Sequence, residues 1–479
     1  MLRKFLLLIL GMLCLLPAYA QDASVERGRV TFTTECSRCH LPAEFDGRLR
    51  ARWIGRSGAE FYQQIRSTMP AETPGSLTND EYYDLAAFLL QSGNVNIEGG
   101  NISIADLESL EINPGIVIAV QADADSTPWT HLNGNVKSTR YSELDQINAS
   151  NVADLAIAWS LDTGPFGPSP ETLSVSTPLM VNGRVYATVG ATRNVVALDA
   201  GSGQLLWMWR PDDGTRFDTA PRKGSGKGLS YYNSGGEEVI FTITPGYYLV
   251  ALNAKTGDPL PSFGAGGFID LQQGLRLGQD RSDLDIGISF PPLVVEDVVI
   301  AGAAHEVGMR PLSASNVKGD IRGFDARTGA LLWTFKTIPE RGQAGYETWL
   351  EVVARTQPYP VLPAPYDRQG FQADDLVDFT PESITQPPLL QGVEIPATGK
   401  PTRSGLVVTK SLLFFGEGPG GDPWLHTVDK ATGETVARIA LPASTTGLPM
   451  TYMHAGKQYL VVTVSDFSNS ARIVALALP

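Results

Sequence analysis

The chain has 479 residues, of which 18% are charged and 43% are hydrophobic, a balance typical of globular domains. Its formal net charge of −14 disfavours a nucleic-acid partner, because binding to phosphates needs a surplus of Lys and Arg. The 49 glycines and 33 prolines favour many short strands over long helices, and the length allows two or three domains.

The N-terminus has the features of an export signal. Basic Arg3 and Lys4 precede an apolar run over residues 5–16, and the sequence Ala-Tyr-Ala at 18–20 ends the segment with small residues two positions apart. A retained membrane anchor is the alternative, but a span needs about 20 apolar residues and this run has about a dozen. We therefore expect a signal peptide over residues 1–20 that is cleaved near Ala20. The mature chain would be periplasmic, with no membrane span and a net charge of −16 after loss of Arg3 and Lys4.

Residues 36–40 read Cys-Ser-Arg-Cys-His, the C-x-x-C-H pattern in which two thiols attach a haem and the histidine binds its iron. For Cys36 and Cys39 alone, a disulfide or a zinc site is the alternative. The adjacent His40, the export signal and a downstream Met69 followed by proline favour haem over both. Met69 is the only methionine between the signal peptide and the repeat region, so its thioether is the candidate second ligand.

A capped amphipathic helix is expected after this methionine. Thr78 is followed three positions later by Glu81, and apolar residues recur at helical spacing from Tyr82 to Leu89. Residues 22–93 resemble a class I cytochrome c domain, which is a small all-α fold. That resemblance implies haem c, with porphyrin attachment and axial ligation by Cys36, Cys39, His40 and Met69.

Residues 94–126 are expected to form a linker, and an internal repeat follows over residues 127–479. Each copy combines an alternating apolar strand, an Asx-initiated turn and a glycine that can adopt positive φ, and a strand pair precedes it. Four strands per copy predict the blades of a β-propeller, in which the repeated Trp side chains pack between blades. The four turns begin at Asp199, Asn253, Asp325 and Asp429.

Longer phrases make the repeat region similar to dehydrogenases that depend on pyrroloquinoline quinone (PQQ), in particular the membrane glucose dehydrogenase-like branch. The resemblance covers nearly all of residues 127–479. It implies a mainly β protein built on an eight-bladed propeller that oxidises alcohols, polyols or aldose sugars, with PQQ near the propeller axis beside Ca or Mg. The phrases lie at residues 139–142, 338–339, 345–349, 357–360, 366–370, 449–452 and 456–459.

The same resemblance gives roles to three residues of the repeat region. Lys227, in Lys-Gly-Leu-Ser-Tyr, stands where relatives have an arginine that pairs with a quinone carboxylate, and it keeps the charge without the two-pronged geometry. Ser289 matches a hydroxyl that hydrogen-bonds the quinone, and Glu306 matches a metal-binding carboxylate. Taken alone, the three would be interpreted as a solvated charge, a turn residue and a surface acid.

The region that carries the catalytic residues of this family is shortened. Trp349 and Gln357 are eight positions apart where relatives hold about two blades, at roughly 50 residues per blade, and a second contraction follows residues 378–382. The family's catalytic aspartate, active-site lysine and stacking aromatic lie in those segments. No catalytic residue can therefore be named, and fewer than eight blades are expected.

Two functions from different classes fit these observations. The first is a dehydrogenase that oxidises a small alcohol or sugar and passes electrons through its own haem to a periplasmic or membrane acceptor. The second is a non-catalytic electron-transfer or docking protein, a cytochrome c whose shortened propeller has lost quinone chemistry. A truncated gene product that does not close a stable ring is a third alternative.

Overall fold

The computed structural model describes residues 22–37, 49, 53–93, 95–112, 126–164, 166, 170–276, 286–305, 317–343, 346, 404–466 and 470–479. The chain divides into two compact units, Met1–Gly115 and Ile116–Pro479. Among the helices in these ranges, none is long and apolar enough to cross a membrane. Cys39, His40 and Glu306 lie outside the described residues, as do the two contractions around 349–357 and 378–399.

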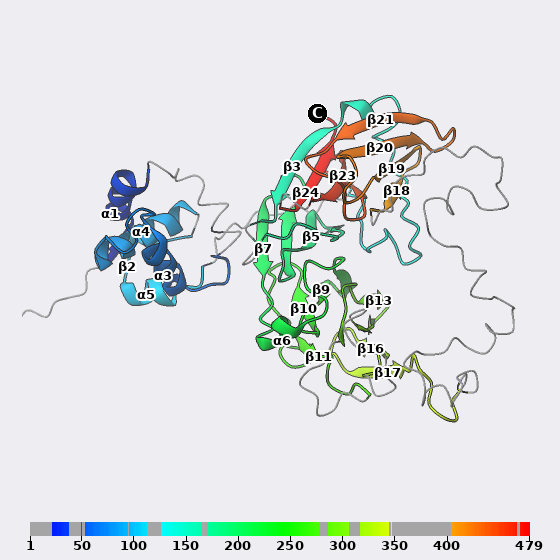
Figure 1. The fold of residues 1–479 in the computed structure, drawn as a ribbon, viewed down its shortest axis with the longest axis horizontal. Helices are drawn as coiled ribbons and strands as arrows, with labels where there is room; N and C mark the ends of the chain where they lie inside the picture. The colour runs from blue at the N-terminus through cyan, green and yellow to red at the C-terminus, as the bar shows by residue number, and fades with distance from the viewer. Residues whose placement is uncertain are drawn as a thin grey trace, which may run out of the picture. The chain divides into compact units, whose positions relative to one another are not determined.

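The N-terminal unit is mainly helical (Figure 1). The expected capped helix is confirmed: the Thr78 hydroxyl accepts from the Glu81 amide, and the Glu81 carboxylate accepts from the Thr78 amide at 2.8 Å. The elements of this unit are β1 (Ala23–Ser24), α1 (Val25–Thr31), η1 (Phe32–Cys36), α3 (Gly58–Thr68), α4 (Asn79–Ser92), η2 (Glu98–Gly100), β2 (Asn101–Ile102) and α5 (Ile104–Ser109).

Helices α1 and α4 pack closely in the core of this unit. Gly28 of α1 allows this approach, because a Cβ there would lie 1.9 Å from the Asp84 carbonyl oxygen. The buried Asp84 carboxylate accepts from the Ser24 amide at 2.6 Å and from Arg27 Nε at 2.8 Å. These charge-assisted bonds fix the start of the chain against α4.

The N-terminal unit extends further than the sequence suggested. Ile97, Leu107 and Ile112 are buried in the same apolar core as the helices, and β2 pairs with β1. The prediction of a linker over 94–126 is therefore wrong for residues 95–112, since apolar side chains at irregular spacing complete this core rather than lying in solvent.

The second unit contains five four-stranded antiparallel sheets among its described residues, which confirms the expected blades. In Figure 1 the sheets follow one another in chain order. The N-terminal strand β3 pairs with the C-terminal strand β24, with Trp159 opposite Ala475, so one sheet joins the two ends of the propeller region. The strands of the five sheets, in their hydrogen-bonded order, are β4 (Leu179–Val181), β5 (Arg184–Val189), β6 (Asn194–Asp199) and β7 (Leu205–Trp209); β8 (Ser230–Ser234), β9 (Glu237–Ile243), β10 (Tyr248–Asn253) and β11 (Phe268–Asp270); β13 (Leu293–Val295), β14 (Val298–Ala301), β16 (Ile321–Asp325) and β17 (Leu331–Phe335); β18 (Leu406–Val408), β19 (Leu412–Gly416), β20 (Trp424–Asp429) and β21 (Thr435–Ala440); and β22 (Met450–His454), β23 (Lys457–Val464), β24 (Arg472–Ala477) and β3 (Ala156–Asp162).

Four further short elements lie in the described part of the propeller unit. β12 (Ile286–Gly287) pairs with β15 (Ala304–His305) in a two-stranded sheet outside the blades. The 3-10 turn η3 (Val152–Asp154) precedes β3, and the short helix α6 (Thr215–Thr219) follows β7.

The repeated turns have the expected chemistry. The Asp199 carboxylate accepts from the amides of Gly201 and Ser202, and the glycine that ends this turn, Gly203, has a φ of 69°. The other three turns repeat the pattern, with positive φ at Gly257, Gly329 and Gly433.

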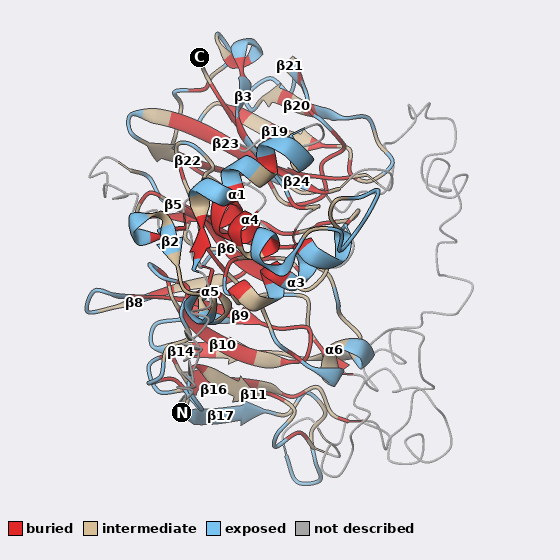
Figure 2. Cartoon of the chain, turned by 90° about the vertical axis from the view of Figure 1, so that its left-hand side faces the viewer, coloured by how far each residue is buried: buried red, intermediate tan, exposed pale blue. Residues whose placement is uncertain are grey.

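Packing of Trp between blades is confirmed at two positions. Trp159 and Trp207 are buried, and their indole nitrogens donate to the carbonyls of Ala200 and Ala254 in the turn of the next blade. Trp333 differs, since it is 40% exposed and the whole of β17 is exposed (Figure 2). The sequence repeat therefore predicts which Trp residues can pack against a neighbouring blade, but it does not predict whether each Trp side chain is buried there.

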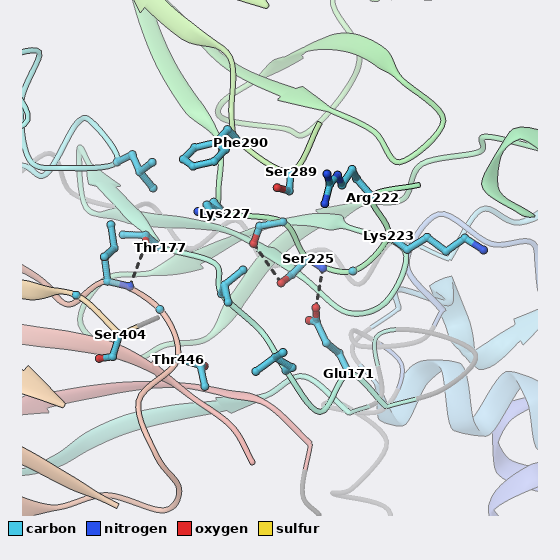
Figure 3. A pocket seen from close by; sticks show the side chains of 18 of the residues that line it. Glu171, Thr177, Arg222, Lys223, Ser225, Lys227, Ser289, Phe290, Ser404 and Thr446 are labelled. Carbon is cyan, nitrogen blue, oxygen red and sulfur yellow. Dashed lines mark hydrogen bonds between the residues drawn. The ribbon is translucent and has the colours of Figure 1, made fainter. Parts of the chain in front are cut away.

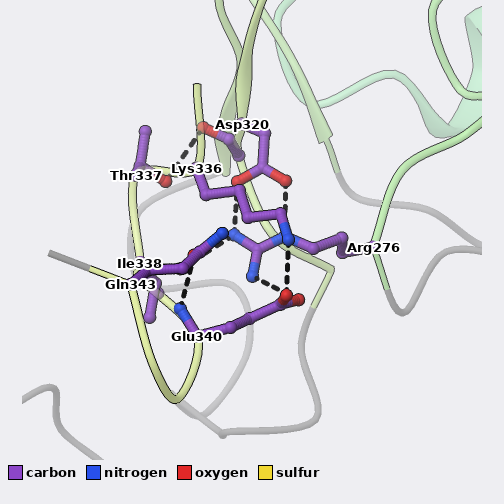
Figure 4. Close-up of polar contacts among 8 residues, drawn as sticks. Arg276, Asp320, Lys336, Thr337, Ile338, Glu340 and Gln343 are labelled. Atoms are coloured by element: carbon purple, nitrogen blue, oxygen red, sulfur yellow. Dashed lines mark hydrogen bonds and ion pairs between the residues drawn. The ribbon is translucent and has the colours of Figure 1, made fainter. Parts of the chain in front are cut away.

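An ion-pair network links three segments beside β16 and β17 (Figure 4). The buried Asp320 carboxylate accepts from Arg276 Nε at 2.6 Å, and Arg276 also contacts Glu340 at 3.3 Å and the Ile338 carbonyl at 3.0 Å. Lys336 pairs with the same Glu340. The network ties residue 276 to residues more than 40 positions later in the chain.

Candidate functional site

A cavity of about 690 Å³ lies where the five sheets begin (Figure 3). Its walls come from the segments that lead into the first strand of each sheet: Thr177 precedes β4, Lys227 precedes β8, Phe290 precedes β13, Ser404 precedes β18 and Thr446 precedes β22. Since each blade contributes the same part of its repeat, the fold collects side chains as far apart in the chain as Leu132 and Leu448, which are 316 positions apart.

Cations and hydroxyls dominate the polar lining of this cavity. Glu171 is the one carboxylate among the described residues that line it. Apolar side chains such as Phe290 and Leu132 complete the wall. Such a site suits a ligand with an apolar body and several negative groups. The cations are Arg140, Arg222, Lys223 and Lys227, and the hydroxyls are Thr177, Ser225, Ser289, Ser404 and Thr446.

The structure brings together the two site residues of the repeat region that it describes. The Lys227 amide donates to the Ser289 carbonyl at 2.7 Å, and both residues line the cavity. Lys227 Nζ lies 3.8 Å from the centre of the Phe290 ring, a cation–π contact. Gly228 follows with a φ of 130°, and a Cβ there would lie 2.8 Å from the Thr177 carbonyl, which explains the glycine in this phrase.

Arg193 is a scaffold residue that the sequence did not single out. It is almost fully buried, and its guanidinium donates to the carbonyls of Arg222 at 2.6 Å, Gly224 at 3.1 Å and Ile288 at 2.8 Å. It therefore fixes two of the segments that form the cavity wall. Burial lowers the pKa of Arg193 to about 10, so it stays charged at neutral pH. A lone arginine in a turn gives no sequence signal for this role.

Glu171 is the second residue that the sequence did not reveal. Its side chain is buried, one carboxylate oxygen accepts from the Ser225 amide at 2.7 Å, and the other has no hydrogen-bond partner among the described residues. Burial raises the pKa of Glu171 to about 7, and the bond from Ser225 opposes this only in part. A single acid in a loop is normally solvated, so only the structure shows this environment.

In the N-terminal unit, Cys36 and Met69 pack against one apolar core. Cys36 ends η1, and Met69 directly follows α3, where the Tyr82 hydroxyl donates to its carbonyl at 2.7 Å. The other two expected haem residues, Cys39 and His40, lie outside the described residues, as does the expected metal ligand Glu306. Among the residues that the structure describes, no group of three His, Cys, Asp or Glu side chains could hold a metal ion.

Four-stranded blades around a cation-lined cavity define a β-propeller whose cavity suits an anionic ligand. Residues 129–351 and 383–460 match a PQQ family of sequences. That family is described as the β-propeller domain of glucose/ethanol/alcohol dehydrogenases. The chain belongs to this family of PQQ-dependent dehydrogenase propellers. The match is interrupted between residues 351 and 383, within the region where the sequence is contracted.

Curated relatives agree with this assignment. The chain is 30% identical over 249 residues to the glycerol dehydrogenase large subunit of Gluconobacter thailandicus, which covers 49% of this chain and 32% of that protein. It is 34% identical over 212 residues to the dehydrogenase subunit of the quinone alcohol dehydrogenase of Gluconobacter oxydans, which covers 44% of this chain and 25% of that protein. It is 29% identical over 269 residues to the quinoprotein glucose dehydrogenase of Escherichia coli, which covers 52% of this chain and 32% of that protein. The aligned region thus spans a quarter to a third of these relatives' length.

Solved structures agree at the level of the fold. The quinohemoprotein alcohol dehydrogenase from Comamonas testosteroni superposes with a TM-score of 0.51 at 15% identity, covering 73% of this chain and 80% of that one. A quinohemoprotein alcohol dehydrogenase from Pseudomonas putida HK5 gives the same TM-score at 16% identity. At this identity the likeness supports the propeller architecture alone.

Proposed function

We propose that the chain is a dehydrogenase that binds PQQ in this cavity and oxidises a CH–OH donor, such as a small alcohol, polyol or aldose sugar. The observation that carries the proposal is the lining of the cavity. PQQ is a flat ring system with three carboxylates, and the lining of the cavity includes four cationic residues, five hydroxyl residues and an apolar wall.

Lys227 and Ser289 would hold the cofactor. Lys227 supplies a point charge for a carboxylate, and its ammonium is positioned over Phe290. Ser289 supplies a hydroxyl from the segment to which the Lys227 backbone is hydrogen-bonded. When bound, PQQ supplies the two-electron acceptor of the oxidation. Arg193 keeps the wall in place through its bonds to backbone carbonyls on two of these segments.

The proposed site also includes a divalent Ca or Mg ion, which Glu306 would bind. This carboxylate matches a metal ligand of the family, and a metal in that place would polarise a quinone carbonyl. Its support is the resemblance of the sequence around residue 306, because that residue lies outside the described part of the chain.

Haem c in the N-terminal unit would receive the electrons. Cys36 and Cys39 would attach it, and His40 and Met69 would bind its iron. The packing of Cys36 and Met69 on one apolar core supports this, since a haem needs both in a shared apolar pocket. A haem on the same chain as the quinone is an acceptor at high effective concentration. Export through residues 1–20 would place the protein in the periplasm, where a periplasmic or membrane acceptor takes the electrons onward.

The second candidate is a cytochrome whose propeller no longer binds quinone. The observation that favours it is coverage: the aligned region spans a quarter to a third of the relatives, and the catalytic segment of the family is among the contracted parts.

One titration separates the two candidates. The haem-loaded protein is titrated with PQQ in the presence of Ca or Mg, and a panel of alcohols and aldoses is then added while the haem bands are recorded. Saturable PQQ binding and substrate-dependent haem reduction are expected from the dehydrogenase. A folded, haem-containing protein that binds no PQQ would establish the second candidate.

A further inference from the structure

Glu171 occupies a fixed position in the cavity with one oxygen left to bind a ligand. Its backbone carbonyl accepts from the Ala471 amide at 2.9 Å, and one carboxylate oxygen accepts from the Ser225 amide at 2.7 Å. Gly224 leaves room for it, because a Cβ there would lie 3.0 Å from the same oxygen. The second oxygen, Oε2, is buried without a partner among the described residues (Figure 3). A buried oxygen in this state costs free energy until a ligand supplies its partner.

Arg193 is the charged neighbour of Glu171, and the other charged groups around it and along the cavity wall come from several elements and are mostly cationic. Arg193, in the turn before β6, directs its N–H groups to backbone carbonyls. Asp213, which follows β7, interacts electrostatically with Arg193, and burial raises the pKa of Asp213. The remaining charged residues of the cavity wall are Arg140, which lies before β3, and Arg222, Lys223 and Lys227, which lie before β8.

We propose that Glu171 is a ligand-binding residue whose protonated Oε2 donates a hydrogen bond to one carboxylate of the bound cofactor. Two carboxylates in contact cannot both be ionised, so one proton must lie between them. Cationic side chains of the cavity wall, Lys227 among them, attract the ligand's carboxylate, which would meet Oε2 as a buried oxygen that has no partner among the described residues. The inference rests on the proposed binding of PQQ and names a further residue of that site.

Binding is therefore coupled to uptake of a proton. The pKa of Glu171 is raised to about 7 in the free protein, and an adjacent ligand carboxylate raises it further. Below this pKa the carboxyl is already protonated and affinity is independent of pH. Above it, each pH unit should raise the Kd of PQQ by up to about tenfold, because a proton must be taken from solution for every ligand bound.

Calorimetric titration of the full chain with PQQ between pH 6 and pH 8.5 tests this. At pH 8, two buffers with different heats of protonation report how many protons are taken up, and this measurement needs no variant. The test variant is Glu171→Gln, which keeps the shape and the ability to donate but cannot ionise. The matched control is Glu238→Gln, since Glu238 is another buried glutamate, bonded to the Tyr231 hydroxyl at 2.7 Å outside the cavity.

The expected result is a Kd that rises with pH above about 7 in the wild type and in Glu238→Gln, with uptake of up to one proton. Glu171→Gln should bind with a Kd that does not change with pH, and at pH 8 it should bind about tenfold more tightly than the wild type. PQQ binding by the wild type without proton uptake overturns this inference and leaves the proposed function in place. Absence of PQQ binding by the wild type at every pH overturns both.

Discussion

The indole ring of Trp207 lies over Gly257 of the next blade, where an added Cβ would come within 2.5 Å of the ring. The indole nitrogen donates to the Ala254 carbonyl at 3.1 Å in the same turn. The Trp207 side chain thus packs on the Gly257 backbone and donates a hydrogen bond to a carbonyl in the same turn of the next blade. This contact between blades is the basis of the first prediction.

Gly257→Ala should destabilise the propeller more than Gly433→Ala. Both glycines end the same kind of turn, with φ of 83° and 76°, so both substitutions cost about 1 kcal/mol of backbone strain. Only Gly257 lies under a Trp ring, while a Cβ at Gly433 would meet no atom within 4 Å. The clash should add about 1–3 kcal/mol to the loss in the free energy of unfolding, measured by denaturant titration. Equal losses in the two variants would contradict this account of the contact.

Asp320→Asn should destabilise the propeller unit by about 1–3 kcal/mol, because it leaves Arg276 without its buried counter-charge. Glu340→Gln removes the other acidic partner of Arg276 and serves as the control. Its carboxylate is half exposed, so little change in stability is expected there. Thermal unfolding of both variants checks the prediction, which fails if the two midpoints shift equally.

Lys227→Met should weaken PQQ binding by about tenfold or more, through loss of a charge-assisted hydrogen bond. Methionine keeps an unbranched apolar chain against Phe290 while it removes the charge, so packing changes little. Lys255→Met provides a control at a lysine that is 57% exposed and does not line the cavity. Binding is measured by calorimetric titration, and an unchanged Kd in Lys227→Met would remove this residue from the site.

The haem ligands should respond differently to substitution. His40→Ala is expected to abolish the low-spin haem spectrum, because it removes the ligand that belongs to the attachment motif. Met69→Ala should leave the haem attached and open one axial position, so that added imidazole binds more readily. Absorption spectra with and without imidazole report both effects. A wild-type spectrum in either variant would reject that residue as a ligand.

Much of the fold follows from local sequence. The cap of α4 was predictable because Thr78 and Glu81 satisfy each other's backbone amides within one helical turn. The blade turns were predictable because an Asx side chain and a glycine with positive φ act within five residues. The N-terminal unit was harder to delimit, since Ile97 and Ile112 enter its core through contacts that no periodic pattern announces.

By itself, the sequence determined the chain of four-stranded blades and the residues at their turns, and its resemblance to PQQ-dependent dehydrogenases made Lys227 and Ser289 candidate site residues. Only the tertiary structure decided that these two residues line one cavity, that Arg193 braces its wall, and that Glu171 is buried there with one oxygen unpaired. The physical reason is that burial and charge environment depend on residues distant in the chain. Glu171 and Ser225 are 54 positions apart, and the Glu171 carbonyl accepts from the amide of Ala471, which is 300 positions later and directly precedes β24.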